Sequence, residues 1–246
     1  METLFISDLH LSTARPDKLA LFRQLLRGPA RRAEALYILG DLFEEFWVGI
    51  DDITAPNPEI VMELTEFTRS GSRLFIQKGN RELLLDRKFG ELTGAVILPD
   101  RAIINLDGER VLLMHGDLLC TRDWKYQIWR QLITFTLSRK LFGWLSYHNR
   151  ILLAHGFRPT LKRSMMRKPA GIMDVHPATV ERYLHSCNVT TLIHGHTHRP
   201  GLHHYNIAGR MSSRLVLGDW YDDAHILVCN GGDRKLIPVC KYLQNR

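Results

Sequence analysis

The stretch Thr3-Leu-Phe-Ile-Ser-Asp-Leu-His10 runs from a short apolar segment straight into an aspartate and a histidine. An apolar run of this length, bounded by turn residues, is typical of a buried strand. Open α/β sheets place their chemistry just past the carboxyl ends of such strands. The stretch therefore predicts a strand that delivers Asp8 and His10 to a site at one edge of a sheet.

Four later segments repeat this arrangement of an apolar run followed by polar residues. The runs cover 35–39, 73–77, 111–114 and 190–193, and the residues that follow them are Gly40-Asp41, Gly79-Asn80-Arg81, His115-Gly116 and Gly195-His196-Thr197-His198. A single Asp-x-His or Gly-Asp is common, and a simple turn explains it. An ordered set of five is not explained in that way, so the five segments predict one shared site.

The side chains of these segments are carboxylates, an amide and imidazoles, without any thiolate. Such a mixed set of oxygen and nitrogen ligands suits Mn²⁺, Fe or Zn²⁺. Two ions roughly 3.5–4 Å apart can hold the attacking and leaving oxygens of a displacement at phosphorus. The pair needs a bridging ligand, and Asp41, which is alone in its motif and offers two oxygens, is the candidate. The residues thus predict a two-metal phosphoesterase.

The order and spacing of the motifs resemble those of the calcineurin-like metallophosphoesterases over nearly the whole chain. The resemblance implies that one metal is held by Asp8, His10, Asp41 and His198, and the other by Asp41, Asn80, His115 and His196. His194 ends the last strand and matches no ligand, so we expect it to pack in the core or to support a ligand.

We expect an α/β fold, the αββα sandwich, in which two packed mixed sheets are flanked by helices. The whole chain, 1–246, would form a single metallophosphoesterase domain with one helical insertion. Strands at 202–207, 213–217, 224–229 and 235–239 are expected to complete the second sheet.

Arg81 is a departure from the generic family, in which most members have histidine after Gly-Asn. Arginine stays charged and cannot donate a proton, but it offers a planar fork to phosphate oxygens. A site without that acid favours a leaving group that departs unaided as an anion, such as a phosphate monoester. Arg81 therefore points to hydrolysis of a pyrophosphate bond, unless it merely pairs with Glu82 or another nearby acid.

Composition and residue patterns argue against a disulfide-stabilised protein, a signal peptide and a membrane-spanning segment. The 246 residues are 45% hydrophobic, enough for a sizeable core. The four cysteines, at 120, 187, 229 and 240, show no C-x-x-C spacing and are typical of free thiols in a reducing cytosol. Residues 1–7 indicate a strand rather than a signal peptide. No uncharged apolar stretch reaches the roughly 18 residues of a membrane span.

A basic segment separates the fourth and fifth motifs. Between Thr121 and Lys168 there are eleven Lys and Arg and one acid, Asp123, so this segment carries +10 and the remainder of the chain −3. It also holds three of the five tryptophans, and its apolar residues recur at helical spacing. We predict a helical cap at about 121–168, close to the metals because it is inserted between site motifs.

Three interpretations of the cap remain open. It could be a solvated basic face over an ordinary core, or a patch that tracks nucleic-acid phosphates and stacks bases. It could instead be a lid that takes an acyl chain and touches an anionic membrane surface. We favour the lid, and expect neither a nucleic-acid partner nor an obligate protein partner.

With the cap included, the chain resembles the UDP-2,3-diacylglucosamine hydrolases of bacterial lipid A biosynthesis. The stretches that carry this resemblance are 5–11, 37–44, 79–81, 113–117, 119–123, 172–175, 192–200 and 216–220. It implies a cap over two Mn²⁺ ions and a lipid-linked UDP-sugar substrate, cleaved at the α-phosphate to UMP and 2,3-diacylglucosamine 1-phosphate. It also implies a cytoplasmic protein attached peripherally to the inner membrane.

The same resemblance implies roles for individual residues. Arg81 and His196 would support the reaction, and the substrate would contact Asn80, Arg81, Asp123, Lys168 and His196. Several positions depart from the family pattern. Glu82 stands where aspartate is usual, and one extra residue lies around 44–47. Either Thr160 and Ser164 or Leu161 and Met165 fill two substrate-contact positions of the cap.

Two other functions are retained as alternatives. The first is a metal-dependent hydrolase of soluble nucleoside diphosphate-linked compounds, in which the cap is only structural. The second is a non-catalytic scaffold, a role that relatives take after losing metal ligands. All seven proposed ligands are present in this chain, which disfavours the scaffold.

Overall fold

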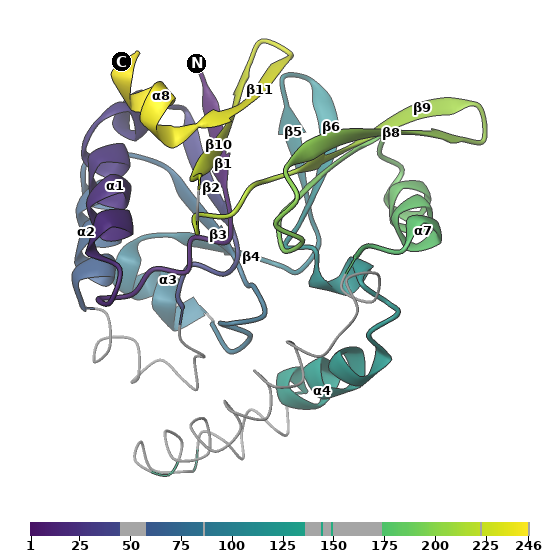
Figure 1. Cartoon of the computed structure of the whole chain (residues 1–246), viewed down its shortest axis with the longest axis horizontal. Coiled ribbons are helices and arrows are strands. Elements are labelled where there is room, and N and C mark those ends of the chain that lie inside the picture. Colours follow the sequence, from purple (N-terminus) through teal and green to yellow (C-terminus); the bar gives the residue numbers. More distant parts are fainter. Residues whose placement is uncertain are drawn as a thin grey trace.

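The computed structural model describes residues 1–44, 58–85, 87–135, 174–221 and 223–245, together with Trp144 and Asn149. Two β-sheets lie face to face, and helices cover both outer faces (Figure 1). This arrangement is the predicted αββα sandwich, so the expected fold class is confirmed.

The first sheet has the strand order β11-β10-β1-β2-β3-β4. Its strands are β1 (Thr3–Ile6), β2 (Ala35–Leu39), β3 (Leu74–Gln77), β4 (Val96–Leu98), β10 (His225–Asn230) and β11 (Asp233–Pro238). Strands β1 to β4 are parallel, and β10 and β11 are antiparallel to their neighbours. The carboxyl ends of β1, β2 and β3 therefore meet at one edge, as the motifs required.

The second sheet has the order β5-β6-β7-β9-β8. Its strands are β5 (Ala102–Leu106), β6 (Glu109–Met114), β7 (Thr191–His194), β8 (Gly201–Ile207) and β9 (Arg210–Val216). Strands β6, β7 and β9 are parallel, whereas β5 and β8 are antiparallel edge strands. The ends of β6 and β7 deliver the remaining two motifs to the site.

The prediction that the strands at 224–229 and 235–239 belong to the second sheet is wrong. Strands β10 and β11 belong to the first sheet, where Leu4 of β1 pairs with Val228 and Phe5 pairs with Leu227. Residues 226–229 are buried, so β10 needs a central position with a strand on each side. Strand β10 has such a position between β1 and β11. Hydrophobic periodicity indicates that a strand is buried, but it does not indicate which strands are its neighbours.

Alternate residues of the central strands pack in opposite directions, as the pleat requires. In β1, Leu4 and Ile6 contribute to the core beneath the helices, whereas Phe5 points between the sheets. The helices on this outer face are α1 (Pro16–Arg27), α2 (Pro58–Arg69), α3 (Arg87–Thr93) and α8 (Val239–Gln244). Between the sheets, Phe5, Tyr37 and Phe75 stack in sequence at centroid distances of 4.9 and 4.6 Å.

Helix α7 (Pro177–Cys187) covers the second sheet. Its Val180 and Leu184 pack with Leu112 and Leu192. The helix begins with proline, whose missing N–H is no loss there, and ends at Asn188 in the left-handed conformation with φ 49°. Two short 3₁₀ turns, Pro29–Arg32 and Asp117–Leu119, complete the connections.

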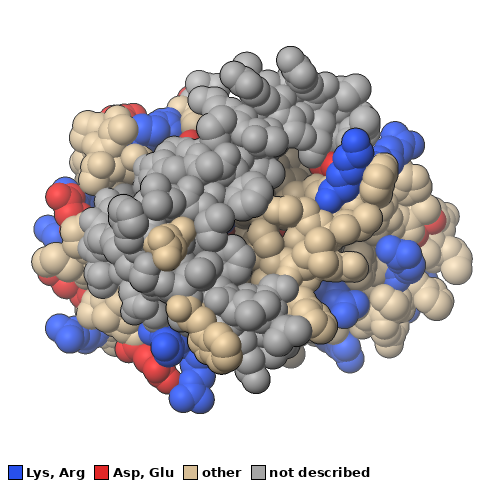
Figure 2. All heavy atoms as spheres, turned by 90° about the horizontal axis from the view of Figure 1, so that it is seen from below, with Lys and Arg blue, Asp and Glu red and all other residues tan. Residues whose placement is uncertain are grey.

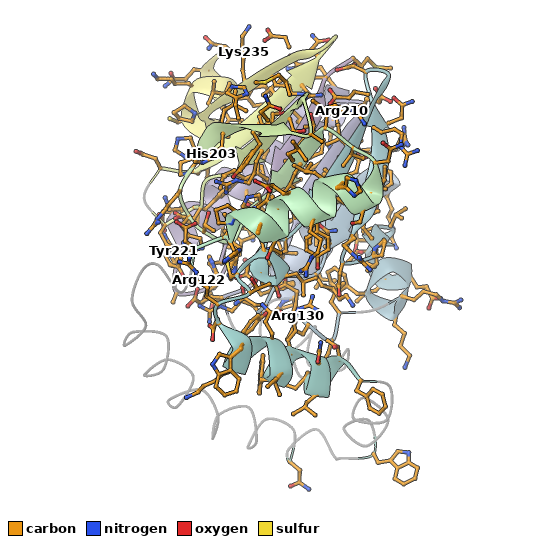
Figure 3. All side chains as sticks on the ribbon, turned by 90° about the vertical axis from the view of Figure 1, so that its right-hand side faces the viewer. Arg122, Arg130, His203, Arg210, Tyr221 and Lys235 are labelled. Carbon is orange, nitrogen blue, oxygen red and sulfur yellow. The ribbon has the colours of Figure 1, made fainter. Side chains whose placement is uncertain are left out.

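Helix α4 (Trp124–Thr134) begins the predicted cap and lies below the sandwich in Figure 1. Its only buried residue is Arg130, which lies on the side facing the sheets (Figure 3). Trp124, Ile128 and Leu132 are exposed, with Leu132 at 62%. The helix therefore turns a polar face inward and an apolar stripe outward, the reverse of an ordinary surface helix. Most of the cap beyond 135 lies outside the described residues, so its boundary stays a prediction.

Candidate metal centre

Five loops meet at one edge of the sandwich, and each follows a strand. Backbone hydrogen bonds join them: the amide of Asp8 donates to Gly40 O at 3.0 Å, and that of His10 to Asp41 O at 3.0 Å. The amide of Gly195 donates to His115 O at 2.8 Å. These bonds hold the loops after β1 and β2 together, and likewise the loops after β6 and β7, while the amide of His196 links the two sheets by donating to Asp8 Oδ2 at 2.8 Å.

The motif glycines permit this close approach. A Cβ atom on Gly79 would lie 2.2 Å from Asp41 Oδ1, and one on Gly195 would lie 2.2 Å from Ser7 Oγ and 2.3 Å from Asp8 Oδ2. Real Cβ atoms do not approach polar atoms so closely. The glycines that precede the candidate ligands are therefore required by packing, whether or not metals are bound.

Five of the candidate ligands have backbones in the left-handed region, which non-glycine residues seldom adopt. Their φ values are 54° for Asp8, 47° for His10, 52° for Asp41, 70° for His196 and 54° for His198. This conformation costs roughly 1–2 kcal/mol per residue, and such strain clusters at functional sites. The strained backbone turns these side chains toward one another.

One group of possible ligand atoms comes from Asp8, His10 and His198, and its atoms lie within 4.8 Å of one another. Asp8 Oδ1 is 3.3 Å from His198 Nε2, and His10 Nε2 is 3.7 Å from Asp41 Oδ2. The structure therefore brings together all four residues that the sequence assigned to the first metal.

A second group comprises Asp8, Asp41 and His115, again with ligand atoms within 4.8 Å. Asn80 Oδ1 lies 3.0 Å from His115 Nε2 and 3.0 Å from His196 Nδ1. All four residues assigned to the second metal are thus adjacent as well.

Asp41 lies between the two groups. Its Oδ2 faces His10, and its Oδ1 is 3.6 Å from His115 Nε2. This is the position that a bridging carboxylate would take. Asp8 also takes part in both groups.

The donor set fits divalent cations. Within the described part of the chain, the buried His10 Nε2 and Asp8 Oδ1 have no hydrogen-bond partner. Buried polar atoms are rarely left unsatisfied, and a cation would satisfy both. Carboxylate, amide and imidazole ligands suit Mn²⁺, Fe or Zn²⁺, in line with the expected chemistry.

Neighbouring acceptors orient two of the imidazoles. Nδ1 of His115 donates to Leu39 O at 2.8 Å, which leaves Nε2 free to face Asn80 and Asp41. Nδ1 of His198 lies 3.0 Å from Asp219 Oδ2, which likewise leaves its Nε2 for Asp8. Such partners fix the ring and raise its basicity toward a metal. No sequence motif marks Asp219 as a supporting residue, although it lies in the stretch 216–220 that resembles the family.

Charges in the site compensate one another. Burial alone would raise the pKa of Asp8, but His198, whose Nε2 lies 3.3 Å from Asp8 Oδ1, and the other nearby imidazoles bring it below its usual value. Burial lowers the pKa of His115, but Asp41 and Asp8 outweigh it and raise that pKa to about 9. The carboxylates therefore attract positive charge, and a metal ion would displace the proton.

Arg81 and Glu82 do not pair as one interpretation held. The buried Glu82 Oε1 accepts hydrogen bonds from the amides of Gly79 at 3.1 Å and Leu42 at 3.3 Å. Burial, and then the charge of Asp41, raise the pKa of Glu82 to about 8. The amide of Arg81 donates to Asp41 Oδ1 at 3.0 Å, and its guanidinium lies 4.0 Å from Glu44. Another nearby acid, Glu44, is thus its neighbour.

Tyr221 and Glu44, to which no sequence motif gives a role, both contact His10. The ring of Tyr221 stacks on His10 with centroids 4.8 Å apart, and its hydroxyl donates to Glu44 Oε2 at 2.7 Å. Glu44 also lies 3.4 Å from His10 Nδ1. No periodicity or motif spacing announces this contact, because 177 residues separate its members.

The expected cap contacts are described only in part. Asp123 is the N-cap of α4, where its carboxylate accepts from the amide of Tyr126 at 3.3 Å. Lys168 lies outside the described residues, as do the alternatives Thr160, Leu161, Ser164 and Met165. Among the described residues, no helix combines the length and apolar character needed to cross a membrane.

Comparisons with known proteins agree with this geometry. Residues 1–200 match the family model described as calcineurin-like phosphoesterase. A protein of Aeromonas salmonicida named UDP-2,3-diacylglucosamine hydrolase is 43% identical over 239 residues, covering 96% of this chain and 92% of that protein. One of the same name from Pseudomonas aeruginosa is 44% identical over 220 residues, covering 89% and 91%.

A solved structure described as a novel archaeal phosphodiesterase shares the fold. It aligns with a TM-score of 0.50 at 12% identity, covering 97% of this chain and 99% of the other. At that identity the likeness concerns the fold alone.

Proposed function

Because the chain belongs to the calcineurin-like phosphoesterase family, we propose that it hydrolyses the pyrophosphate bond of UDP-2,3-diacylglucosamine. Attack at the α-phosphate gives UMP and 2,3-diacylglucosamine 1-phosphate in lipid A biosynthesis. The observation that carries this proposal is the pair of relatives with that activity in their names, which match about nine-tenths of the chain or more.

The proposed ligands of a dinuclear centre are the seven residues brought together above. They are Asp8, His10, Asp41, Asn80, His115, His196 and His198. Two divalent ions, when bound, would activate water and neutralise charge on phosphate oxygens. We infer that the ions are Mn²⁺, because a site with four imidazoles disfavours the harder Mg²⁺.

Arg81 suits the leaving group of this reaction. Its guanidinium cannot supply a proton, but a phosphate monoester leaves a pyrophosphate as a stable anion. Its backbone bond to Asp41 and its approach to Glu44 place it beside the candidate metal centre. There it would stabilise charge that develops on the diphosphate, and His196 would do so from the ligand shell.

Substrate contacts are proposed for Asn80, Arg81, Asp123, Lys168 and His196. The first two and His196 lie at the candidate metal centre, and Asp123 begins the helix that lies next to it. The exposed apolar stripe of α4 supports a cap that meets acyl chains. Asp123 would orient a polar group of the sugar, and Lys168 a phosphate.

We also propose peripheral attachment to an anionic membrane surface at the cytoplasmic face. The support is the +10 charge of segment 121–168, together with the exposed Trp124. Figure 2 shows the molecule from below, the side on which α4 lies in Figure 1. In this view described Lys and Arg side chains lie around the edge of the molecule, with acidic side chains among them. Binding to vesicles of phosphatidylglycerol should weaken as salt rises, since charges are screened over about 10 Å at 0.1 M. Absence of binding to such vesicles at low salt would contradict this proposal.

The decisive test of function compares three substrates with purified protein and Mn²⁺. Diacylated UDP-glucosamine should be cleaved at least about a hundredfold more efficiently than deacylated UDP-glucosamine or ADP-ribose. Each buried methylene is worth roughly 0.8 kcal/mol, so even partial burial of the chains is sufficient. Equal efficiencies would instead identify a hydrolase of soluble nucleoside diphosphate compounds. If none of the three compounds is cleaved, the non-catalytic scaffold becomes the favoured function.

A further inference from the structure

Arg130 is a charged residue in an unusual place. It is 6% exposed and is the only buried residue of α4, in which Trp124, Ile128 and Leu132 are exposed. Burying a guanidinium is costly unless it is paired and hydrogen-bonded. Its partners should therefore account for how this helix is held against the sandwich.

One partner is Asp117, in the turn that follows the candidate ligand His115. Nε of Arg130 donates to Asp117 Oδ2 at 2.7 Å, and the same oxygen accepts from the Tyr126 hydroxyl at 2.5 Å. One turn of the helix away from Arg130, Gln127 Nε2 donates to the backbone carbonyl of Asp117 at 2.8 Å. Three side chains of α4 thus converge on one buried residue.

The other partner lies on a different loop. Nη2 of Arg130 is 3.0 Å from Asp100 Oδ2, and Asp100 Oδ1 is 3.6 Å from Lys78 Nζ. Lys78 immediately precedes Gly79 and the candidate ligand Asn80. Arg130 therefore connects the helix directly to the turn after His115 and, through Asp100 and Lys78, to the loop of Asn80, which are two of the four loops that carry ligands of the second proposed metal.

We propose that Arg130 is a positioning residue, which fixes the first cap helix to the loops of Asn80 and His115. Hydrophobic burial contributes little to this task, because Trp124, Ile128 and Leu132 of α4 are exposed and no apolar residue of the helix is fully buried. The ion pairs on both sides of the guanidinium instead fix the rotation of the helix about its own axis and its distance from the sheets. These in turn set the position of Asp123, the N-cap of the helix.

The consequence for selectivity rests on the proposed function. Asp123 and the cap serve a large lipid-linked substrate, whereas a small activated phosphodiester needs only the metal centre. Loss of Arg130 should therefore impair the large substrate and spare the small one. Arg130 would act through the placement of the cap and would not itself touch the reacting atoms.

The first experiment measures the anchoring itself by hydrogen exchange of the Mn²⁺-loaded protein. In Arg130→Met, amides of 124–134 should exchange at least about tenfold faster than in wild type, and those of β1 and β2 should not change. Lys125→Met, which removes an exposed cation from the same helix, is the matched control and should leave exchange unchanged. Unchanged exchange in Arg130→Met would overturn the proposal without reference to any substrate.

The second experiment compares kcat/KM for diacylated UDP-glucosamine with that for bis(p-nitrophenyl) phosphate. In Arg130→Met the first value should fall at least about tenfold, the second should stay within about twofold, and Arg130→Lys should recover part of the loss. Equal losses on both substrates would overturn the proposal, because Arg130 would then act on the metal centre through Asp117. If Arg130→Met fails to fold, Asp100→Asn, which weakens one side of the anchor, replaces it in both experiments.

Failure of the proposed function gives a different result. Wild-type protein would then not cleave the lipid-linked substrate, while the exchange experiment would still report whether Arg130 anchors α4.

Discussion

Asp219 Oδ2 lies 3.0 Å from Nδ1 of His198, so one carboxylate holds the imidazole whose other nitrogen faces Asp8. Burial lowers the pKa of His198, but Asp219 and Asp8 raise it to about 10. The pair joins the loop after β7 to the loop after β9. In the metal-loaded protein this would be a carboxylate–histidine–metal arrangement.

Asp219→Asn should weaken metal binding more than it weakens the fold. The loss of a supporting carboxylate typically costs 10- to 100-fold in metal affinity or activity. We expect the Mn²⁺ concentration for half-maximal activity to rise by about that factor, with near-normal activity at saturation. Titration of chelated protein with Mn²⁺ measures this, and Asp223→Asn, an exposed aspartate four residues on, is the control. An unchanged titration would show that Asp219 does not support His198.

Asp41→Ala should be the most damaging replacement among the candidate ligands, since Asp41 faces both His10 and His115. Chelation of the wild type should abolish hydrolysis, and Mn²⁺ should restore it better than Mg²⁺. Metal analysis of Asp41→Ala should find both ions lost, whereas His198→Ala should retain one. Full activity in excess chelator would refute the dinuclear centre.

Glu109→Gln should lower stability at neutral pH. Glu109 binds Arg234 at 2.6 Å and Thr191 at 2.5 Å, and so joins β6 and β7 of the second sheet to β11 of the first. Burial raises the pKa of Glu109, but bonds from Thr191 and Arg234 bring it below its usual value. This stability is therefore present above the unfolded pKa of about 4.5 and is lost as pH falls through the lower folded pKa.

Urea unfolding at pH 7 should show a loss of about 1 kcal/mol for Glu109→Gln, a modest value because the pair is partly exposed. Below pH 4 the difference from wild type should shrink. Glu91→Gln, which removes an exposed pair with Arg87, should change little at either pH. A pH-independent loss would mean that the charge of Glu109 is not what matters.

Leu132→Asp should reduce activity on the acylated substrate selectively. Leu132 lies on the exposed apolar stripe of α4, so the change leaves the core intact. The contact of two methylenes is worth roughly 1.6 kcal/mol, which predicts a loss in kcat/KM of at least about tenfold. Activity on deacylated UDP-glucosamine should be unaffected, and Gln131→Asp on the same helix is the control. Equal behaviour of the two variants would remove α4 from acyl recognition.

Much of the candidate metal centre could be predicted from the sequence because each motif is local. A strand, a glycine and a ligand follow one another within a few residues, and the resulting loops meet because parallel strands end at one edge. The left-handed φ values of Asp8 and Asp41 could not have been foreseen, since those residues show no mark of strain in sequence.

What sequence missed depends on contacts between distant segments. Asp219 supports His198 across a strand pair, and Tyr221 stacks on His10 from the other end of the chain. Strand β10 was recognised as a strand, but its neighbour β1 lies more than 200 residues away. Periodicity reports which face of an element is buried, not which element covers it.

The inverted helix α4 has a thermodynamic consequence. Because its one buried side chain is Arg130 and its Trp124, Ile128 and Leu132 are already exposed, release of α4 would expose little new apolar surface. Heat capacity changes and urea sensitivity both scale with exposed surface. Local opening of α4 should therefore have a small ΔCp and depend little on urea, while it responds to salt. The free energy of opening α4 should then vary nearly linearly with temperature, whereas the stability of the β-sandwich follows the curved profile that a large ΔCp produces.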